Sequence, residues 1–210
     1  MIGSKRAFLT AAGAALLVPP RAFAQALSPT PRQTEGPFYP YQRPLEDDFD
    51  LTRLKGHSGR AKGDILDLSG RVLTRDGKPA GKVLVELWQA NAAGRYAHPG
   101  DSNNALPLDP DFQGFGTQRT DGEGRFRFIT VRPAAYPSGR SMRPSHIHFK
   151  FKNAENDLTT QMYFPGDPYL ARDGVFRGQS TTSSPLFGKL APNGPGGATL
   201  CTWTVVLANA

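Results

Sequence analysis

The chain has 210 residues, which is enough for one well-packed domain and too few for two of ordinary size. With 38% hydrophobic and 20% charged residues the composition is that of a globular protein, and 23 glycines and 19 prolines argue against a mainly helical one. The formal net charge of +7 is moderate and the basic residues are scattered, so we expect no nucleic-acid partner.

Residues 1–24 have the pattern of an export signal peptide. Lys5 and Arg6 form its positive end, an apolar stretch covers residues 8–18, and Ala22-Phe23-Ala24 is typical of a cleavage site. The Lys5-Arg6 pair resembles a twin-arginine signal with Lys in the first position, and general secretion is the alternative route. No segment reaches the roughly 20 apolar residues of a permanent membrane span. We therefore predict an exported, periplasmic protein.

Residues 25–63 are rich in proline, glycine and mixed charge, and we expect an N-terminal arm wrapped on a core. From residue 64 to residue 210 the hydrophobic pattern has a period of two, which predicts a single β domain. Alternating strands are expected at residues 66–72, 82–89, 125–130, 146–151, 159–164 and 199–207.

Turn residues separate these strands. The Asp76-Gly77 pair predicts a hairpin turn between the first two, and a second turn is expected at residues 121–124. The aperiodic stretch at residues 90–119 is long enough to predict a functional loop. Since no segment has a sustained helical period, we predict an all-β fold, an antiparallel β-sandwich with long functional loops and the wrapping arm.

Cys201 is the single cysteine, which rules out an intrachain disulfide. It lies in the apolar run Leu200-Cys201-Thr202-Trp203 near the end of the chain. We therefore expect a buried and inert thiol.

His146 and His148 are the most informative pair of residues. On a strand, side chains two apart point to the same face, so both imidazoles should face one point while Ile147 and Phe149 face the core. Two histidines on a polar strand face are the structural alternative. Only four histidines occur in the chain, however, which favours a metal site. His98 could complete a zinc or copper site, although no carboxylate lies at a diagnostic spacing.

Several motifs resemble, in order, those of the intradiol ring-cleavage dioxygenases, with the protocatechuate 3,4-dioxygenase branch and the type of its iron-bearing beta chain as the closest likeness. They are Glu35-Gly36-Pro37-Phe38-Tyr39, Leu87-Trp88-Gln89-Ala90-Asn91-Ala92-Ala93-Gly94-Arg95-Tyr96, Arg132-Pro133-Ala134-Ala135-Tyr136-Pro137, Arg143-Pro144-Ser145-His146-Ile147-His148-Phe149 and Thr160-Gln161-Met162-Tyr163-Phe164-Pro165-Gly166-Asp167-Pro168. The likeness covers most of the chain after the predicted signal.

The resemblance implies a ferric ion held by Tyr96, Tyr136, His146 and His148. Phenolate is a hard, anionic donor that favours Fe(III), whereas imidazole suits several metals. The implied reaction opens the ring of a catechol-type substrate (protocatechuate, catechol or hydroxyquinol-like) with O2 and gives a cis,cis-muconate-type diacid. Tyr136 is implied to be the ligand that substrate displaces, and therefore also a base.

The resemblance also assigns residues around the metal. Arg143 matches an active-site arginine that would stabilise negative charge on the ring, with a structural salt bridge as its alternative. Pro37 and Gln161 are expected in the substrate pocket, with an outward strand position as the alternative for Gln161. Ser138 departs from the family pattern, which leaves the pocket shape open. Members of the family assemble, so a homo-oligomer is compatible with the resemblance.

A non-enzymatic binding module is the main alternative class. The strand and turn pattern at residues 70–85 and 120–128 also fits transthyretin-like and carboxypeptidase-regulatory-like β-sandwiches. Such a module would explain the fold. It would give no reason for Tyr96, Tyr136, His146 and His148 to occur together in the dioxygenase order.

Overall fold

The structure is a computed structural model that describes residues 26–42, 46–192 and 194–209. The predicted signal peptide, residues 1–24, lies outside the described residues. The described part of the chain contains strands and short 3-10 helices and no α-helix: β1 (Ile65–Leu73), β2 (Leu84–Trp88), η1 (Pro99–Asp101), β3 (Phe115–Arg119), β4 (Arg125–Val131), β5 (Tyr136–Ser138), β6 (Ser141–Arg143), β7 (His146–Lys152), β8 (Asp157–Tyr163), η2 (Leu170–Arg172), β9 (Lys189–Ala191), η3 (Pro195–Gly197) and β10 (Thr199–Val206).

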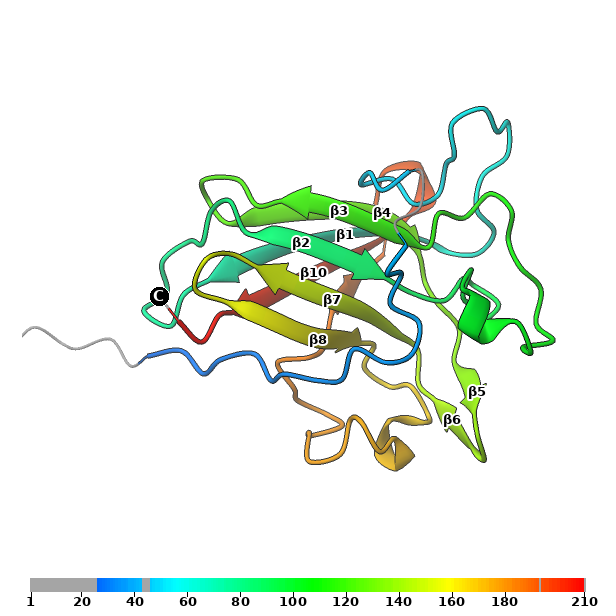
Figure 1. Cartoon of the computed structure of the whole chain (residues 1–210). Helices are drawn as coiled ribbons and strands as arrows, with labels where there is room; N and C mark the ends of the chain where they lie inside the picture. The colour runs from blue at the N-terminus through cyan, green and yellow to red at the C-terminus, as the bar shows by residue number, and fades with distance from the viewer. Residues whose placement is uncertain (1–25, 43–45, 193, 210) are drawn as a thin grey trace, which may run out of the picture.

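Two four-stranded sheets form a sandwich, as predicted (Figure 1). Sheet A has the strand order β4-β1-β10-β9, and sheet B has the order β3-β2-β7-β8. The short strands β5 and β6 form a separate hairpin that projects beyond one end of the sandwich (Figure 1). This hairpin and the loop after β2 place long segments at the same end as the start of β7.

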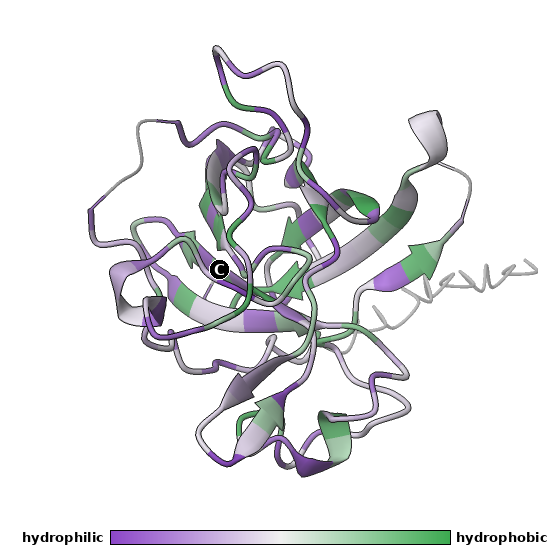
Figure 2. Ribbon diagram, turned by 90° about the vertical axis from the view of Figure 1, so that its right-hand side faces the viewer, coloured by the Kyte–Doolittle hydropathy of each residue, from purple (hydrophilic) through white to green (hydrophobic). Residues whose placement is uncertain are grey.

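The core lies between the two sheets because the strands alternate. In β4, Phe126 and Phe128 are buried while Arg125 and Arg127 are exposed. Figure 2 shows hydrophobic and hydrophilic residues in turn along the strands. Cys201 belongs to this core, as expected, and burial raises the pKa of its thiol to about 12, so the thiol stays protonated and inert.

One expectation about strand pairing is wrong. The Asp76-Gly77 turn forms, with Gly77 at φ +80°, but the chain then crosses to the other sheet, so β1 and β2 do not make a hairpin. The pairs between the named strands are antiparallel, as predicted, apart from β1, which pairs in parallel with β10. The residues of a turn determine how the chain bends, but they do not determine which strand β1 pairs with. That choice depends on how the apolar faces of the strands are buried.

The segment from residue 26 to residue 42 runs extended beside β8 (Figure 1). Backbone hydrogen bonds tie it to both sheets: the Thr30 amide donates to the Val206 carbonyl, and the Gln33 amide donates to the Thr159 carbonyl. The Lys150 ammonium, which lies 3.9 Å from the centre of the Tyr39 ring, pairs with the Glu35 carboxylate. This segment therefore reaches the end of the sandwich where β7 begins.

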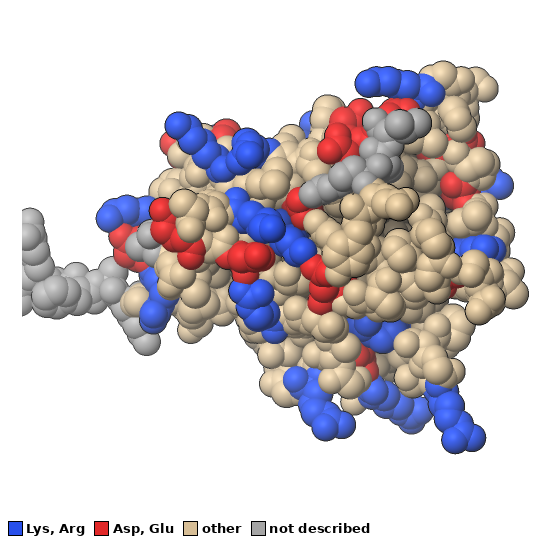
Figure 3. Space-filling view, viewed as in Figure 1, with Lys and Arg blue, Asp and Glu red and all other residues tan. Residues whose placement is uncertain are grey.

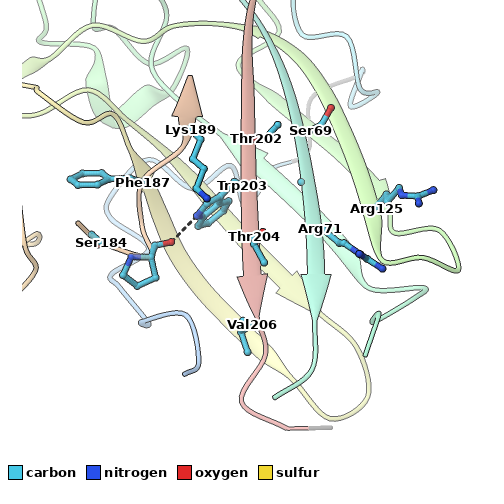
Figure 4. A pocket seen from close by; sticks show the side chains of 12 residues that line it. Ser69, Arg71, Arg125, Ser184, Phe187, Lys189, Thr202, Trp203, Thr204 and Val206 are labelled. Atoms are coloured by element: carbon cyan, nitrogen blue, oxygen red, sulfur yellow. Dashed lines mark hydrogen bonds between the residues drawn. The ribbon is translucent and has the colours of Figure 1, made fainter. Parts of the chain in front are cut away.

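The outer face of sheet A carries a hollow of about 520 Å³, and Figure 4 shows the side chains that line it. Its floor includes Thr202 and Thr204 of β10 and Arg71 of β1, and the Trp203 indole donates to the Pro185 carbonyl at 2.8 Å. None of the predicted site residues lines this hollow. Figure 3 shows Lys and Arg interspersed with Asp and Glu on the face in view. No helix in the described ranges has the length and apolar character needed to cross a bilayer.

Candidate active site

Four aromatic rings from three separated segments meet at one end of sheet B. Ring centroids lie 5.6 Å apart for Tyr96 and Tyr136, 5.6 Å for Tyr136 and His146, and 4.8 Å for His146 and His148. The ring centroids of Tyr96 and His148 lie 6.3 Å apart, so each of the four rings has two of the others as neighbours. None of the four residues is more than 5% exposed. The structure therefore brings together the four residues that the sequence predicts as metal ligands.

Strand β7 presents the two imidazoles in the way that strand geometry predicts. His146 and His148 share one face, and Ile147 and Phe149 belong to the core between the sheets. Trp88 of β2 is the register partner of His148, and their rings stack with centroids 4.9 Å apart. The neighbouring strand thus limits how far the His148 ring can turn.

Hydrogen bonding and burial keep the His146 imidazole neutral, with a lone pair on Nε2. Its Nδ1 lies 2.6 Å from the Pro144 carbonyl, which can only accept, so Nδ1 carries the proton and Nε2 keeps its lone pair. Nε2 of His146 lies 3.2 Å from Nε2 of His148. Burial, and then the nearby Arg143 charge, lower the pKa of His146 to about 3, and burial holds the pKa of His148 well below its usual value. Both rings are neutral at physiological pH, as metal ligands must be.

The loop after β2 positions Tyr96 through a tight turn. The Asn91 side chain accepts hydrogen bonds from the backbone amides of Ala93 and Arg95, and Gly94 adopts φ +88°. A Cβ on Gly94 would lie 3.0 Å from the Ala135 carbonyl oxygen, so only glycine lets this loop approach the segment before Tyr136 so closely.

Tyr136 and Arg143 face each other across the β5–β6 hairpin, in which they are register partners. Burial raises the pKa of Tyr136, and the guanidinium charge of Arg143 acts against that rise. Burial likewise raises the pKa of Tyr96 well above its usual range. Without a bound cation, both phenols are therefore protonated at neutral pH.

Arg143 is held by hydrogen bonds on two sides. Its Nε donates to Asp173 at 2.9 Å, and its Nη2 donates to the Gln161 side-chain oxygen at 2.7 Å. The Tyr163 hydroxyl also donates to the Gln161 oxygen, at 2.9 Å. Gln161 lies on the face of β8 opposite to the core residue Met162, and it is fully buried because the N-terminal segment covers that face.

The N-terminal segment covers the rings. The Gln161 amide donates to the Thr34 carbonyl at 2.9 Å, and a Cβ on Gly36, at φ +72°, would lie 3.3 Å from the His148 ring. Phe38 stacks on Tyr96 with ring centroids 4.5 Å apart. Pro37 lies exposed between these two contacts, and its place in a substrate pocket stays a prediction.

A cavity of about 220 Å³ adjoins the rings on the side of Tyr96 and Trp88. Phe38 and His98 also line it, and the His98 Nδ1 accepts a hydrogen bond from the Gly100 amide. Within the described residues no group of three His, Cys, Asp or Glu side chains could hold a metal, so the alternative site with His98 as third ligand is not assembled.

The donor set fits a ferric ion. The buried Tyr96 hydroxyl makes no hydrogen bond of normal geometry, although the neighbouring Tyr136 contributes to the rise of its pKa. An unpartnered buried polar group is costly, and a bound cation would remove that cost by taking the phenolate as a ligand. Two phenols with two neutral imidazoles are a hard, mixed oxygen and nitrogen set that suits Fe(III).

Comparison with known proteins identifies the family. The family model described as "Dioxygenase" matches residues 34–207. The chain therefore belongs to the intradiol ring-cleavage dioxygenases, a family of enzymes, and the family match favours an enzyme over the transthyretin-like binding module.

Two curated relatives are informative. The chain is 51% identical over 136 residues to the protocatechuate 3,4-dioxygenase beta chain of Burkholderia cepacia, which covers 62% of this chain and 57% of the relative. It is 38% identical over 163 residues to catechol 1,2-dioxygenase 2 of Acinetobacter lwoffii, which covers 70% of this chain and 55% of the relative. The matched region thus spans little more than half of either relative.

Solved structures have the same fold. The dioxygenase domain of a dioxygenase and carbohydrate-binding fusion from Streptomyces sp. SirexAA-E superimposes with a TM-score of 0.66 at 31% identity, covering 87% of this chain and 100% of that chain. Catechol 1,2-dioxygenase of Acinetobacter radioresistens gives a TM-score of 0.68 at 25% identity, covering 88% of this chain and 64% of that chain.

Sequence reasoning gave no role to four residues that contact the site: Trp88, Phe38, Tyr163 and Asp173. Tyr163 could have been found, because it lies two residues after Gln161 on an alternating strand and so shares its face. Asp173 has no such local signal. It follows the short helix η2 in a loop, and only the tertiary structure places its carboxylate beside Arg143.

Proposed function

We propose that the protein is a non-haem Fe(III) intradiol dioxygenase that cleaves the aromatic ring of a catechol-type substrate. The bond between the two hydroxyl-bearing carbons breaks, both atoms of O2 enter the product, and a cis,cis-muconate-type diacid results. The observation that carries this proposal is the convergence of two phenols and two neutral imidazoles, all buried, at one point.

Tyr96, Tyr136, His146 and His148 would hold the iron. The bound ferric ion would supply a Lewis acid that withdraws electron density from an aromatic diolate. Tyr136 is the proposed base because it is paired with Arg143 in the β5–β6 hairpin. The positive charge of Arg143 favours the deprotonated form of the Tyr136 phenol. Its phenolate oxygen would take a proton from one hydroxyl group of the incoming diol.

Arg143 would stabilise negative charge on the ring. A guanidinium fixed by Asp173 and Gln161 needs no reorganisation when charge develops, which is the condition for effective electrostatic catalysis. The remaining polar contacts of Gln161 hold the N-terminal segment over the site. We place Gln161 and Pro37 at the border of the substrate pocket.

The likeness to a protocatechuate 3,4-dioxygenase beta chain and to a catechol 1,2-dioxygenase supports an aromatic 1,2-diol and O2 as substrates. We propose protocatechuate, catechol or a hydroxyquinol-like compound. Oxygen uptake with these three diols, followed by ultraviolet detection of the diacid product, tests the proposal and ranks the substrates. 1,4-Hydroquinone, which cannot chelate through adjacent oxygens, is the negative control.

The metal site is tested by colour and composition. Tyrosinate bound to Fe(III) absorbs visible light through charge transfer, so the iron-supplemented protein should be red and contain one iron per chain. Tyr136→Phe should alter or bleach the colour, whereas Tyr169→Phe, at an exposed position, should not. A colourless, iron-free protein that consumes no oxygen after iron supplementation would refute the proposal.

We also propose export to the periplasm, which rests on the signal pattern of residues 1–24. Fractionation of cells that express the full chain tests it, and the mature protein should start near Gln25. Deletion of residues 1–24 should retain the protein in the cytoplasm. A homo-oligomer agrees with the family's habit, and light scattering of the purified protein decides that question.

A further inference from the structure

A buried ion pair lies beside the proposed metal site. The Arg143 side chain is 12% exposed and the Asp173 side chain is 0% exposed, with Nε and Oδ2 2.9 Å apart. Removing two charges from water costs several kcal/mol per ion unless each is paired and hydrogen-bonded. Both conditions are met here, so the pair holds a defined geometry.

The loop backbone fixes the carboxylate from its other side. Oδ1 of Asp173 accepts the amide hydrogen of Val175 at 2.6 Å and lies 3.4 Å from the amide nitrogen of Phe176. Phe176 is fully buried and packs against Tyr163 with ring centroids 4.8 Å apart. These contacts hold the Asp173 carboxylate in place through Oδ1, and its other oxygen, Oδ2, accepts the hydrogen bond from Arg143.

The guanidinium has three edges, and two are occupied. Nε donates to Asp173, and Nη2 donates to Gln161 and lies 3.4 Å from the Tyr163 hydroxyl. Among the residues that the structure describes, no hydrogen-bond partner is found for Nη1. Because a guanidinium is planar, fixing Nε and Nη2 also fixes the direction of the Nη1 hydrogens.

We infer that Asp173 is a positioning residue for ring cleavage: it orients the Arg143 guanidinium so that the Nη1 edge stays available to the negative charge of the bound diolate. This inference rests on the proposed function. Arg143 is the register partner of Tyr136 in the β5–β6 hairpin, so the oriented edge belongs to the segment that also carries a proposed ligand.

Asp173→Asn is the discriminating substitution. An amide has one acceptor oxygen, so the variant can accept from either the Val175 amide or the Arg143 Nε, and its NH2 group then faces the other donor. Asp173→Glu keeps the charge and both acceptors at a slightly shifted position. A positioning role predicts that Glu retains more activity than Asn.

The matched control is the other well-formed Asp–Arg pair. Arg127 binds Asp67 through Nε at 2.7 Å and Nη2 at 2.8 Å on the outer face of sheet A, away from the four rings. Asp67→Asn removes the same kind of charge without touching the site. Melting temperatures of both variants show whether each is folded.

The kinetic test is oxygen uptake by the iron-loaded full chain. We expect Asp173→Asn to lower kcat about 10- to 100-fold with little change in KM, because the lost interaction acts on charge that develops during the reaction. Iron content should stay at the wild-type level. Asp67→Asn should keep the wild-type kcat.

A second test needs neither iron nor turnover. Arg143→Ala leaves a space between Asp173 and Gln161, and calorimetry on the metal-free full chain should detect saturable binding of guanidinium ion there. Potassium chloride at equal concentration should not compete. The double variant Arg143→Ala/Asp173→Asn should lose the binding.

A rescue measurement on the iron-loaded protein complements the calorimetry. Guanidinium should restore activity to Arg143→Ala and not to the double variant.

Two results overturn the inference: an Asp173→Asn kcat equal to that of Asp67→Asn, or guanidinium binding that is the same with and without Asp173. If the wild-type protein oxidises no diol at all, the proposed function fails instead. The calorimetry on Arg143→Ala then still decides whether Asp173 holds a guanidinium.

Discussion

The two sheets use the same alternating pattern for different purposes. In the first four residues of β4 in sheet A, exposed arginines alternate with buried phenylalanines. One face of this strand therefore packs in the core, and the other faces solvent. In β7 of sheet B six consecutive residues are buried. Sheet A thus exposes one face along β4, whereas sheet B has a second buried face on which His146 and His148 lie.

A second buried face needs a cover. Burying polar side chains without partners is costly, and the N-terminal segment meets part of that need through the Thr34 carbonyl and the Gln33 side chain, which bind Gln161 and Tyr163. On the outer face of sheet A, by contrast, Arg71, Thr202 and Thr204 are exposed to solvent. The candidate site thus lies on the sheet with two covered faces: the other sheet covers one face, and the N-terminal segment covers part of the second.

The largest effect is expected on sheet B. His146→Ala should abolish stoichiometric iron binding and lower ring-cleavage activity by about 1000-fold or more, since the metal would lose one of its two nitrogen donors. Iron analysis and oxygen uptake measure both effects. His57→Ala, at an exposed position, is the control. An iron-replete, active His146→Ala protein would contradict the assignment of this ligand.

On sheet A, a core substitution should reduce stability and leave chemistry intact. Leu68 is fully buried in β1, and Leu68→Ala should lower the free energy of unfolding by about 2–5 kcal/mol. Urea denaturation measures the loss. Below the unfolding transition, the kcat per folded chain should match that of the wild type. A change in kcat comparable to the His146→Ala effect would show that the two sheets are not independent.

Acid should destabilise the metal-free protein through sheet B. The folded pKa of His146 is about 3 against an ordinary 6.5, so the unfolded chain takes up the proton first as the pH falls. The contribution of His146 to stability is therefore constant above pH 6.5 and declines between pH 6.5 and 3, by about 1.4 kcal/mol per pH unit, and the lowered pKa of His148 acts in the same direction. Urea titrations at pH 7, 6 and 5 test this. A flat profile would mean that the imidazoles are charged in the folded state.

The smallest effect is expected on the outer face of sheet A. Arg71 pairs with Glu123 at 3.6 Å, and both side chains are about half exposed. Arg71→Gln should change the free energy of unfolding by about 0.5 kcal/mol or less, because exposed ion pairs contribute little. A loss above 2 kcal/mol would show that the pair is buried in the native protein, in contrast to the half-exposed side chains of the structure.

Much of the fold could be predicted from hydrophobic alternation. The six predicted strands correspond to β1, β2, β4, β7, β8 and β10. The missed strand β3 lies inside the stretch predicted as a loop, because its Phe115-Gly116-Thr117 start carries little alternation. The parallel pairing of β1 with β10 joins distant parts of the chain, and no local pattern encodes it.

The site was predictable where residue type and spacing have chemical meaning. Two histidines on one strand face follow from geometry, and the tyrosines followed from the family motifs. The partners of Arg143 did not, because Asp173 and the Thr34 carbonyl reach the site only through tertiary contacts. Backbone groups and loop carboxylates have no sequence signature of their own.

The close approach of Gly94 to the Ala135 carbonyl has a consequence for how specificity can change. Main chain lies directly against main chain at this point, so backbone contact sets how closely the loop of Tyr96 approaches the segment that carries Tyr136. His98 borders the cavity beside Tyr96 and takes no part in this backbone contact. Under the proposed function, substitutions at such a position would change which diols fit, while the loop of Tyr96 and the segment of Tyr136 keep their backbone contact.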